Sequence, residues 1–245
     1  MNDDGGKPPP LRLLFGEVRL ARDWLRARTR PLDHIVEPVG DGAPIVTLPG
    51  FCAGDLSMAQ MRRNLRSAGF RARGWQMGAN LGARPDTLER LHARVAAIAD
   101  SEGRAVHLVG WSLGGVFARE YAKRHSDMVA SVITMGSPFS GSRRANHAWR
   151  LYRFIAGHSV DDAPIAFHPA AKPDVPTYAL WSPRDGVVAA PSARGETHES
   201  DRAVELSCGH LGFAYDVQAI DAVIACVMEA EAQRTSHMNF HTRSC

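Results

Sequence analysis

The sequence predicts an α/β protein whose mainly parallel central sheet carries helices on both faces, with a small helical cap inserted late in the chain. Three observations predict it. Short apolar runs alternate with segments of helical periodicity, which favours parallel strands joined by right-handed crossovers. A serine in a glycine-rich turn directly follows one of these runs, and an aromatic segment without strand alternation interrupts the order before the last two strands. Sheets of this kind place their sites at the carboxyl ends of the strands.

Composition indicates one ordinary globular domain. The 245 residues are 44% hydrophobic and 22% charged, which argues against a disordered, collagen-like or disulfide-dense chain. No stretch approaches the ~18 uninterrupted apolar residues of a membrane-spanning helix. The start, MNDDGGKPPP, is acidic and proline-rich and lacks the apolar core of a secretory signal. We therefore expect a cytoplasmic protein.

Charge and cysteine content point to no special partner. The formal net charge is +3 and comes almost wholly from arginine, so we expect no nucleic-acid binding. The four cysteines show neither a C-x-x-C spacing nor a nearby metal-ligand pattern, which favours a reducing compartment and leaves one disulfide open. They are Cys52, Cys208, Cys226 and Cys245. The sequence does not predict an oligomeric state.

Residues 1–42 are predicted to be a tail followed by an amphipathic helix over residues 11–30. One helix face carries apolar residues at the expected spacing, namely Leu14, Val18, Ala21 and Leu25. Six arginines against Glu17 and Asp23 make the helix basic. Two roles stay open. The apolar face packs on the domain, which is the more common role, or the helix makes weak contact with a membrane surface.

Residues 43–232 are predicted to form the α/β domain. Apolar runs predict strands at 43–48, 71–76, 105–109, 129–135, 177–181 and 203–206. Periodicity predicts helices at 57–67, 87–101, 113–125 and 215–232. Ser57 and Thr87 are the expected helix caps, and Gly69 is an expected stop. The aromatic segment 140–175 is the predicted cap or lid, and residues 233–245 are a predicted tail.

The candidate nucleophile is Ser112, in the sequence Gly-Trp-Ser-Leu-Gly-Gly over residues 110–115. A serine between a strand and a helix stands on a tight turn with its hydroxyl pushed out above the sheet. Gly110 and Gly114 keep side chains out of that turn. The N-terminus of the following helix favours developing negative charge. The alternative is a tight turn with an inert serine.

A serine hydroxyl needs a base to take its proton, and His210 is the candidate. It follows the predicted strand 203–206 and precedes the final helix. His198 competes but lies in a polar loop before that strand. Other histidines have predicted structural roles, in a strand, at a helix end or in the tail. They are His107, His125, and His237 with His241. With Cys245 the tail pair has a spacing that could hold a metal, but we expect a mobile tail and no metal site.

Asp185 is the candidate carboxylate that orients the base. It follows the predicted strand 177–181 and lies 73 positions after Ser112 and 25 before His210. The order Ser, Asp, His is the one expected when such a triad is built on this kind of sheet. A turn aspartate before glycine is the alternative role. Three other aspartates fall in the predicted cap and are poorer candidates: Asp161, Asp162 and Asp174.

An oxyanion formed during acyl transfer needs two backbone donors. The N–H of Leu113, which follows the candidate nucleophile, is one. The loop after the first strand, Leu48 to Gly54, offers the N–H of Phe51 as the other. Cys52 stands beside it, but no neighbouring basic residue favours a thiolate, so we interpret it as inert.

These motifs together resemble the α/β-hydrolase superfamily, especially its bacterial lipase and esterase-like members. The resemblance covers about residues 43–230 and rests on LPGF, GWSLGG, ITMGSPFSG, SPRDGVV and CGHLGF. It implies that Ser112, Asp185 and His210 form the catalytic triad, that Phe51 and Leu113 form the oxyanion hole, and that no cofactor is needed. One departure is that many lipases carry His-Gly in the oxyanion loop, where this chain has Pro49-Gly50.

The sequence therefore predicts a serine hydrolase that cleaves carboxylic esters through an acyl-enzyme. Aromatic residues within 149–167 would line an apolar pocket, so a small apolar ester is the expected substrate. Two alternatives stay open. The same serine passes its acyl group to an alcohol or amine, as in an acyltransferase, or the chain is a non-catalytic binding protein on a hydrolase scaffold.

Overall fold

The protein is built around one six-stranded parallel sheet. The computed structural model describes residues 8–29, 37–141 and 168–242. Within them the strand order is β2-β1-β3-β4-β5-β6, and every neighbouring pair is parallel. The strands are β1 (Pro44–Leu48), β2 (Arg71–Gly74), β3 (Val106–Trp111), β4 (Val129–Met135), β5 (Thr177–Trp181) and β6 (Arg202–Glu205). The predicted sheet is confirmed, with strand ends shifted by at most two residues.

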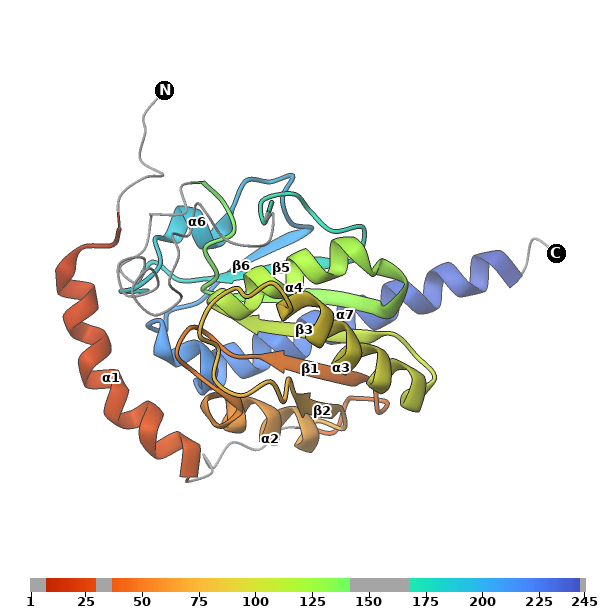
Figure 1. Cartoon of the computed structure of the whole chain (residues 1–245), viewed down its shortest axis with the longest axis horizontal. Helices are drawn as coiled ribbons and strands as arrows, with labels where there is room; N and C mark the ends of the chain where they lie inside the picture. Colours follow the sequence, from red (N-terminus) through yellow and green to blue (C-terminus); the bar gives the residue numbers. More distant parts are fainter. Residues whose placement is uncertain (1–7, 30–36, 142–167, 243–245) are drawn as a thin grey trace.

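Helices follow β1, β2, β3 and β5 in the chain, and helices cover both faces of the sheet (Figure 1). The α-helices are α1 (Leu11–Thr29), α2 (Ala59–Ser67), α3 (Thr87–Glu102), α4 (Leu113–Arg124), α6 (Ala190–Arg194) and α7 (Val217–Thr242). Short 3-10 helices are η2 (Asp55–Met58), η3 (Ser126–Met128) and η4 (Leu211–Ala214). Among the helices described, none is long and apolar enough to span a membrane.

The core lies in two layers because successive side chains of a strand point to opposite faces. One layer packs α2 and α7 against strand residues that include Ile45, Val109 and Ile133. The other packs α3 and α4 against their neighbours Val46, Leu108 and Val132. Burial on both faces explains why β1, β3 and β4 read as continuous apolar runs rather than as alternating patterns.

The two predicted helix caps are wrong. The chain leaves β1 through the 3-10 helix η2, and within it the Ser57 hydroxyl donates to the carbonyl of Gly54 at 2.7 Å, so it caps nothing. Thr87 is the first residue of α3, and its hydroxyl accepts a hydrogen bond from the N–H of Arg84. The predicted stop at Gly69 agrees with its left-handed φ of 96° just beyond α2.

The C-terminal end of the chain differs from the prediction, and the predicted cap lies mostly outside the described residues. Helix α7 continues to Thr242, through most of the segment predicted to be a tail, because residues 217–242 contain neither glycine nor proline. In Figure 1 its last turns, in blue, extend beyond the body of the domain. The predicted cap, 140–175, falls largely on residues 142–167, which lie outside the described part of the chain.

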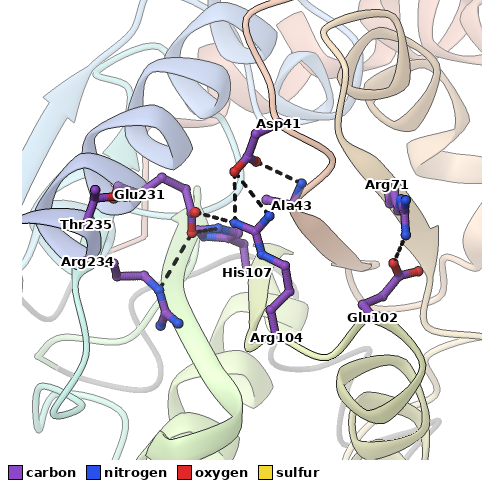
Figure 2. Close-up of polar contacts among 9 residues, drawn as sticks. All are labelled: Asp41, Ala43, Arg71, Glu102, Arg104, His107, Glu231, Arg234 and Thr235. Carbon is purple, nitrogen blue, oxygen red and sulfur yellow. Dashed lines mark hydrogen bonds and ion pairs between the residues drawn. The ribbon is translucent and has the colours of Figure 1, made fainter. Parts of the chain in front are cut away.

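A polar network at the amino end of the sheet ties α7 to β3 (Figure 2). His107, on β3, is fully buried, with Nδ1 2.8 Å from the Ser131 hydroxyl and Nε2 2.9 Å from a carboxylate oxygen of Glu231. Arg104 bridges Glu231 to Asp41. The strand histidine is therefore a hydrogen-bonded core residue, at the opposite end of the sheet from the candidate site.

Candidate active site

Ser112 occupies the sharp turn between β3 and α4. Its φ of 54° and ψ of −123° lie in a region that residues with a side chain rarely adopt. The surrounding backbone holds it there, because the Ser112 N–H donates to the carbonyl of Met135 at 2.9 Å and its own carbonyl accepts from Gly115 at 3.0 Å. The tight turn predicted from the sequence is present, and its backbone is strained.

Glycines allow the neighbouring strands to approach this turn. A Cβ on Gly114 would overlap the carbonyl oxygen of Leu48, at the end of β1. A Cβ on Gly50 would lie 3.2 Å from the Cβ of Ser112. The loop after β1 therefore lies directly against the serine, as a donor loop for an oxyanion must.

Asn80 holds this loop, residues 49–54, in place. Its side-chain amide donates to the carbonyl of Pro49 at 2.8 Å, and its backbone pairs with Cys52 and Ala53. Cys52 has a positive φ of 59°, and burial raises the pKa of its thiol, so a neutral thiol agrees with the inert role expected. Leu113 is the first residue of α4, so its N–H has no carbonyl acceptor within that helix.

Asp185 and His210 are hydrogen-bonded to each other. Oδ2 of Asp185 lies 2.8 Å from Nδ1 of His210, and both side chains are almost fully buried. The second oxygen, Oδ1, accepts from the N–H groups of Val187 and Val188, each at 2.8 Å. The carboxylate is thereby fixed, and it orients the imidazole. The two residues stand in the loops that follow β5 and β6.

The pKa of His210 lies above its ordinary value. Burial alone would lower it, but the charge of Asp185, the hydrogen bond with that carboxylate and the charge of Glu17 together outweigh burial. The surroundings of the ring therefore favour the imidazolium form.

The histidine is also packed against the residue before the candidate nucleophile. The Trp111 indole N–H donates to the carbonyl of His210 at 3.0 Å, and the two rings lie 5.7 Å apart. Phe213 meets the imidazole edge-on at 6.5 Å. The ends of β3, β5 and β6 therefore converge, bringing the turn of Ser112 close to the Asp185–His210 pair.

Glu17, on α1, was missed as a site residue. It is 6% exposed, and its carboxylate accepts from the N–H groups of Gly186, His210 and Leu211. A signal was available, because a glutamate three residues after Leu14 and four before Ala21 lies at the border of the apolar face. The sequence could not show which loops that face would meet.

Arg119, on α4, was also missed. It is fully buried and donates to the carbonyls of Pro169, Ala170 and Glu199 at 2.5, 3.1 and 2.7 Å. Burial lowers its pKa to about 10, so it remains charged at neutral pH. Arg119 therefore attaches the helix that follows Ser112 to the chain on both sides of β5.

The remaining candidates stand apart from this site. His125 stacks on Tyr121 and His92 near the end of α4, and His198 lies in the turn before β6. The predicted aspartates Asp161 and Asp162 lie outside the described residues. Within residues 8–29, 37–141 and 168–242, no group of three or more metal-ligating side chains could hold an ion.

Comparison with solved structures finds the same fold in several hydrolases. A lipase from Bacillus licheniformis is 20% identical, covering 81% of this chain and 96% of its own, with a TM-score of 0.55. An esterase from Exiguobacterium antarcticum is 17% identical, covering 78% and 94%, with a TM-score of 0.54. A membrane phospholipase A described as a bacterial virulence factor is 16% identical, covering 91% and 99%, with a TM-score of 0.57. These likenesses show the α/β-hydrolase fold.

Sequence comparison adds the family. No curated protein matches the chain significantly. The model of the palmitoyl protein thioesterase family matches residues 44–173, which is more than half of the chain and contains both the loop after β1 and the turn of Ser112. The chain belongs to the palmitoyl protein thioesterase family.

Proposed function

We propose that this protein is a serine hydrolase that cleaves acyl esters, thioesters included, through an acyl-enzyme. The observation that carries the proposal is the 2.8 Å hydrogen bond between Asp185 and His210, buried beside the strained turn of Ser112. A serine turn, an oriented imidazole and a fixed carboxylate are the three parts that acyl transfer to serine requires. Family membership supports the same class of reaction.

The first half of the reaction forms the acyl-enzyme. His210 takes the hydroxyl proton of Ser112 through Nε2 while Oγ attacks the carbonyl carbon of the substrate. The carbonyl oxygen becomes an oxyanion, and the N–H groups of Phe51 and Leu113 stabilise it. Asp185 stabilises the imidazolium that forms. The C–O or C–S bond then breaks, and the imidazolium returns its proton to the departing alkoxide or thiolate.

The second half releases the acid. A water molecule gives a proton to His210 and attacks the acyl carbon. The resulting oxyanion accepts hydrogen bonds from the same two N–H groups. Collapse breaks the bond to Ser112 Oγ, which regains its proton from the imidazolium. The serine, the histidine and the aspartate end in their starting states, and the products are a carboxylic acid and an alcohol or thiol.

The acyl part of the substrate is apolar in this proposal. The sequence predicts an aromatic lining within residues 149–167, outside the described part of the chain, and the family name adds a palmitoyl group and a thioester bond. A thiolate leaves more readily than the alkoxide of a simple alcohol because a thiol, with a pKa of about 8.5, is the stronger acid. We therefore expect a palmitoyl thioester to react faster than a palmitoyl ester of a simple alcohol, and p-nitrophenyl octanoate to react faster than p-nitrophenyl acetate.

A fluorophosphonate probe tests the nucleophile. The wild-type protein should be labelled, Ser112→Ala should not, and Ser126→Ala, at an exposed serine of η3, should be labelled like the wild type. Absence of labelling in the wild-type protein would favour the non-catalytic binding protein. Product analysis with an added alcohol then separates hydrolysis from acyl transfer, because an acyltransferase would yield the new ester in preference to the acid.

A further inference from the structure

We propose that Glu17, from the N-terminal helix α1, is a positioning residue that holds the loops of Asp185 and His210 together. The inference rests on the proposed function and extends it to a segment outside the region matched by the family model, which begins at residue 44. In Figure 1, α1 lies at the side of the molecule toward which the arrows of β1 and β3 point, which is the carboxyl edge of the sheet.

The contact is a clamp made by one carboxylate. Oε1 of Glu17 accepts from the N–H of Gly186 at 3.1 Å and from the N–H of His210 at 2.5 Å. Oε2 accepts from the N–H of Leu211 at 3.0 Å. Gly186 directly follows the candidate acid, so a single side chain binds the acid loop and the base loop. Hydrogen bonds to an ionised carboxylate are stronger than those between neutral groups.

The hydrogen bonds of Glu17 matter because its carboxylate is buried. Glu17 is 6% exposed, and a buried carboxylate is costly unless hydrogen bonds satisfy it. The three N–H groups supply these hydrogen bonds. Removing the carboxylate would leave the three N–H groups without this acceptor. Backbone contact reinforces the arrangement, because a Cβ on Gly186 would overlap the carbonyl oxygen of Leu13. Helix α1 is therefore seated directly on the acid loop.

The clamp also acts on the imidazole electrostatically. The charge of Glu17 adds to that of Asp185 in raising the pKa of His210. Cys208 lies two positions before His210 in the chain, and burial raises its pKa to about 12, so it contributes a neutral thiol. Loss of the Glu17 charge should move the acid limb of the pH–rate profile to lower pH. A purely structural role for α1 would leave the limb in place.

The test compares Glu17→Gln with Glu37→Gln, which makes the same chemical change at an exposed site. For Glu17→Gln we expect kcat to fall about 10- to 100-fold with little change in KM, as is typical when a group that orients a catalytic residue is lost. The acid limb of kcat/KM should shift to lower pH. Amide hydrogen exchange should rise in peptides covering Gly186 and His210–Leu211. Glu37→Gln should match the wild type in all three measurements.

Glu17→Asp covers the case in which Glu17→Gln does not fold. It keeps the charge but shortens the reach, so we expect lower kcat with the acid limb close to its wild-type position. Unchanged kcat and an unmoved limb in a folded variant at position 17 would overturn the proposal. Failure of the proposed function gives a different result, because the wild-type protein would then not react with the fluorophosphonate. The positioning role of Glu17 fails if the wild-type protein reacts and the folded variant at position 17 has the same kcat and the same acid limb as the wild type.

Discussion

The guanidinium of Arg119 lies 4.1 Å above the ring centroid of Phe139, and this stack joins α4 to the segment that follows β4. The same guanidinium donates to backbone carbonyls of Pro169 and Glu199. One side chain on α4 therefore holds together three segments from different parts of the sequence, namely the one after β4 and those before β5 and β6.

Arg119→Ala should strongly destabilise the protein. It would leave buried carbonyls unpaired, and losing one partner of a buried charged network costs roughly 3–5 kcal/mol. Urea denaturation of the variant and the wild type measures the difference in free energy of unfolding. Arg90→Ala is the control, because Arg90 is exposed and its pair with Asp86 spans 3.8 Å, so its loss should cost less than about 1 kcal/mol. Equal effects of the two substitutions would contradict this role for Arg119.

Asp185→Asn should remove most of the activity and shift its pH dependence. The asparagine cannot stabilise the imidazolium or fix its tautomer, and the comparable change in a serine protease triad lowers kcat roughly 10⁴-fold. In the wild type, kcat/KM should rise with pH as His210 loses its proton, with a midpoint above about 6.5 because the pKa of His210 is raised. Rates measured from pH 5 to 9 check both statements. Asp86→Asn, at an exposed residue, is the control. A flat wild-type profile would contradict the role of His210 as the base.

His107 should make the protein less stable in acid. Burial lowers the pKa of His107, and this outweighs its hydrogen bond with Glu231; Arg104 and Arg234 face the same pair and lower it further. The folded state then binds fewer protons than the unfolded state, so stability is lost as pH falls through the unfolded value of about 6.5.

The measurement is the free energy of unfolding between pH 5 and 8 for the wild type and for His107→Gln. The variant keeps a donor for Glu231 but cannot take up a proton, so its decline over this range should be shallower. Since the pKa of His210 is raised, His210 contributes the opposite sign, namely stability that is present below its unfolded pKa and lost as pH rises through its folded pKa. A steeper acid decline in His107→Gln would disprove the assignment.

We also propose that α1 makes weak contact with anionic membranes. Leu11 and Phe15 are 61% and 71% exposed on a basic helix, which suits a surface carrying negative lipid headgroups. Sedimentation with phosphatidylserine vesicles should bring down part of the protein at low salt and little at 1 M salt, because screening removes the attraction. Phe15→Ser should weaken binding, and phosphatidylcholine vesicles are the control. Equal binding to both vesicle types, or none to either, would argue against the contact.

The sequence by itself determined the parallel sheet, the strained turn of Ser112 and the order Ser112, Asp185, His210, because each depends on local pattern. Gly110 and Gly114 indicate that the start of α4 packs closely against β3 and the end of β1, and a polar residue directly after a buried run marks a strand end. The tertiary structure alone decided that Glu17 reaches His210 across 193 positions and that Arg119 meets carbonyls 50 and 80 positions away. A buried charge is satisfied by whichever N–H or carbonyl groups the loops leave unpaired, and only the folded chain brings those groups together.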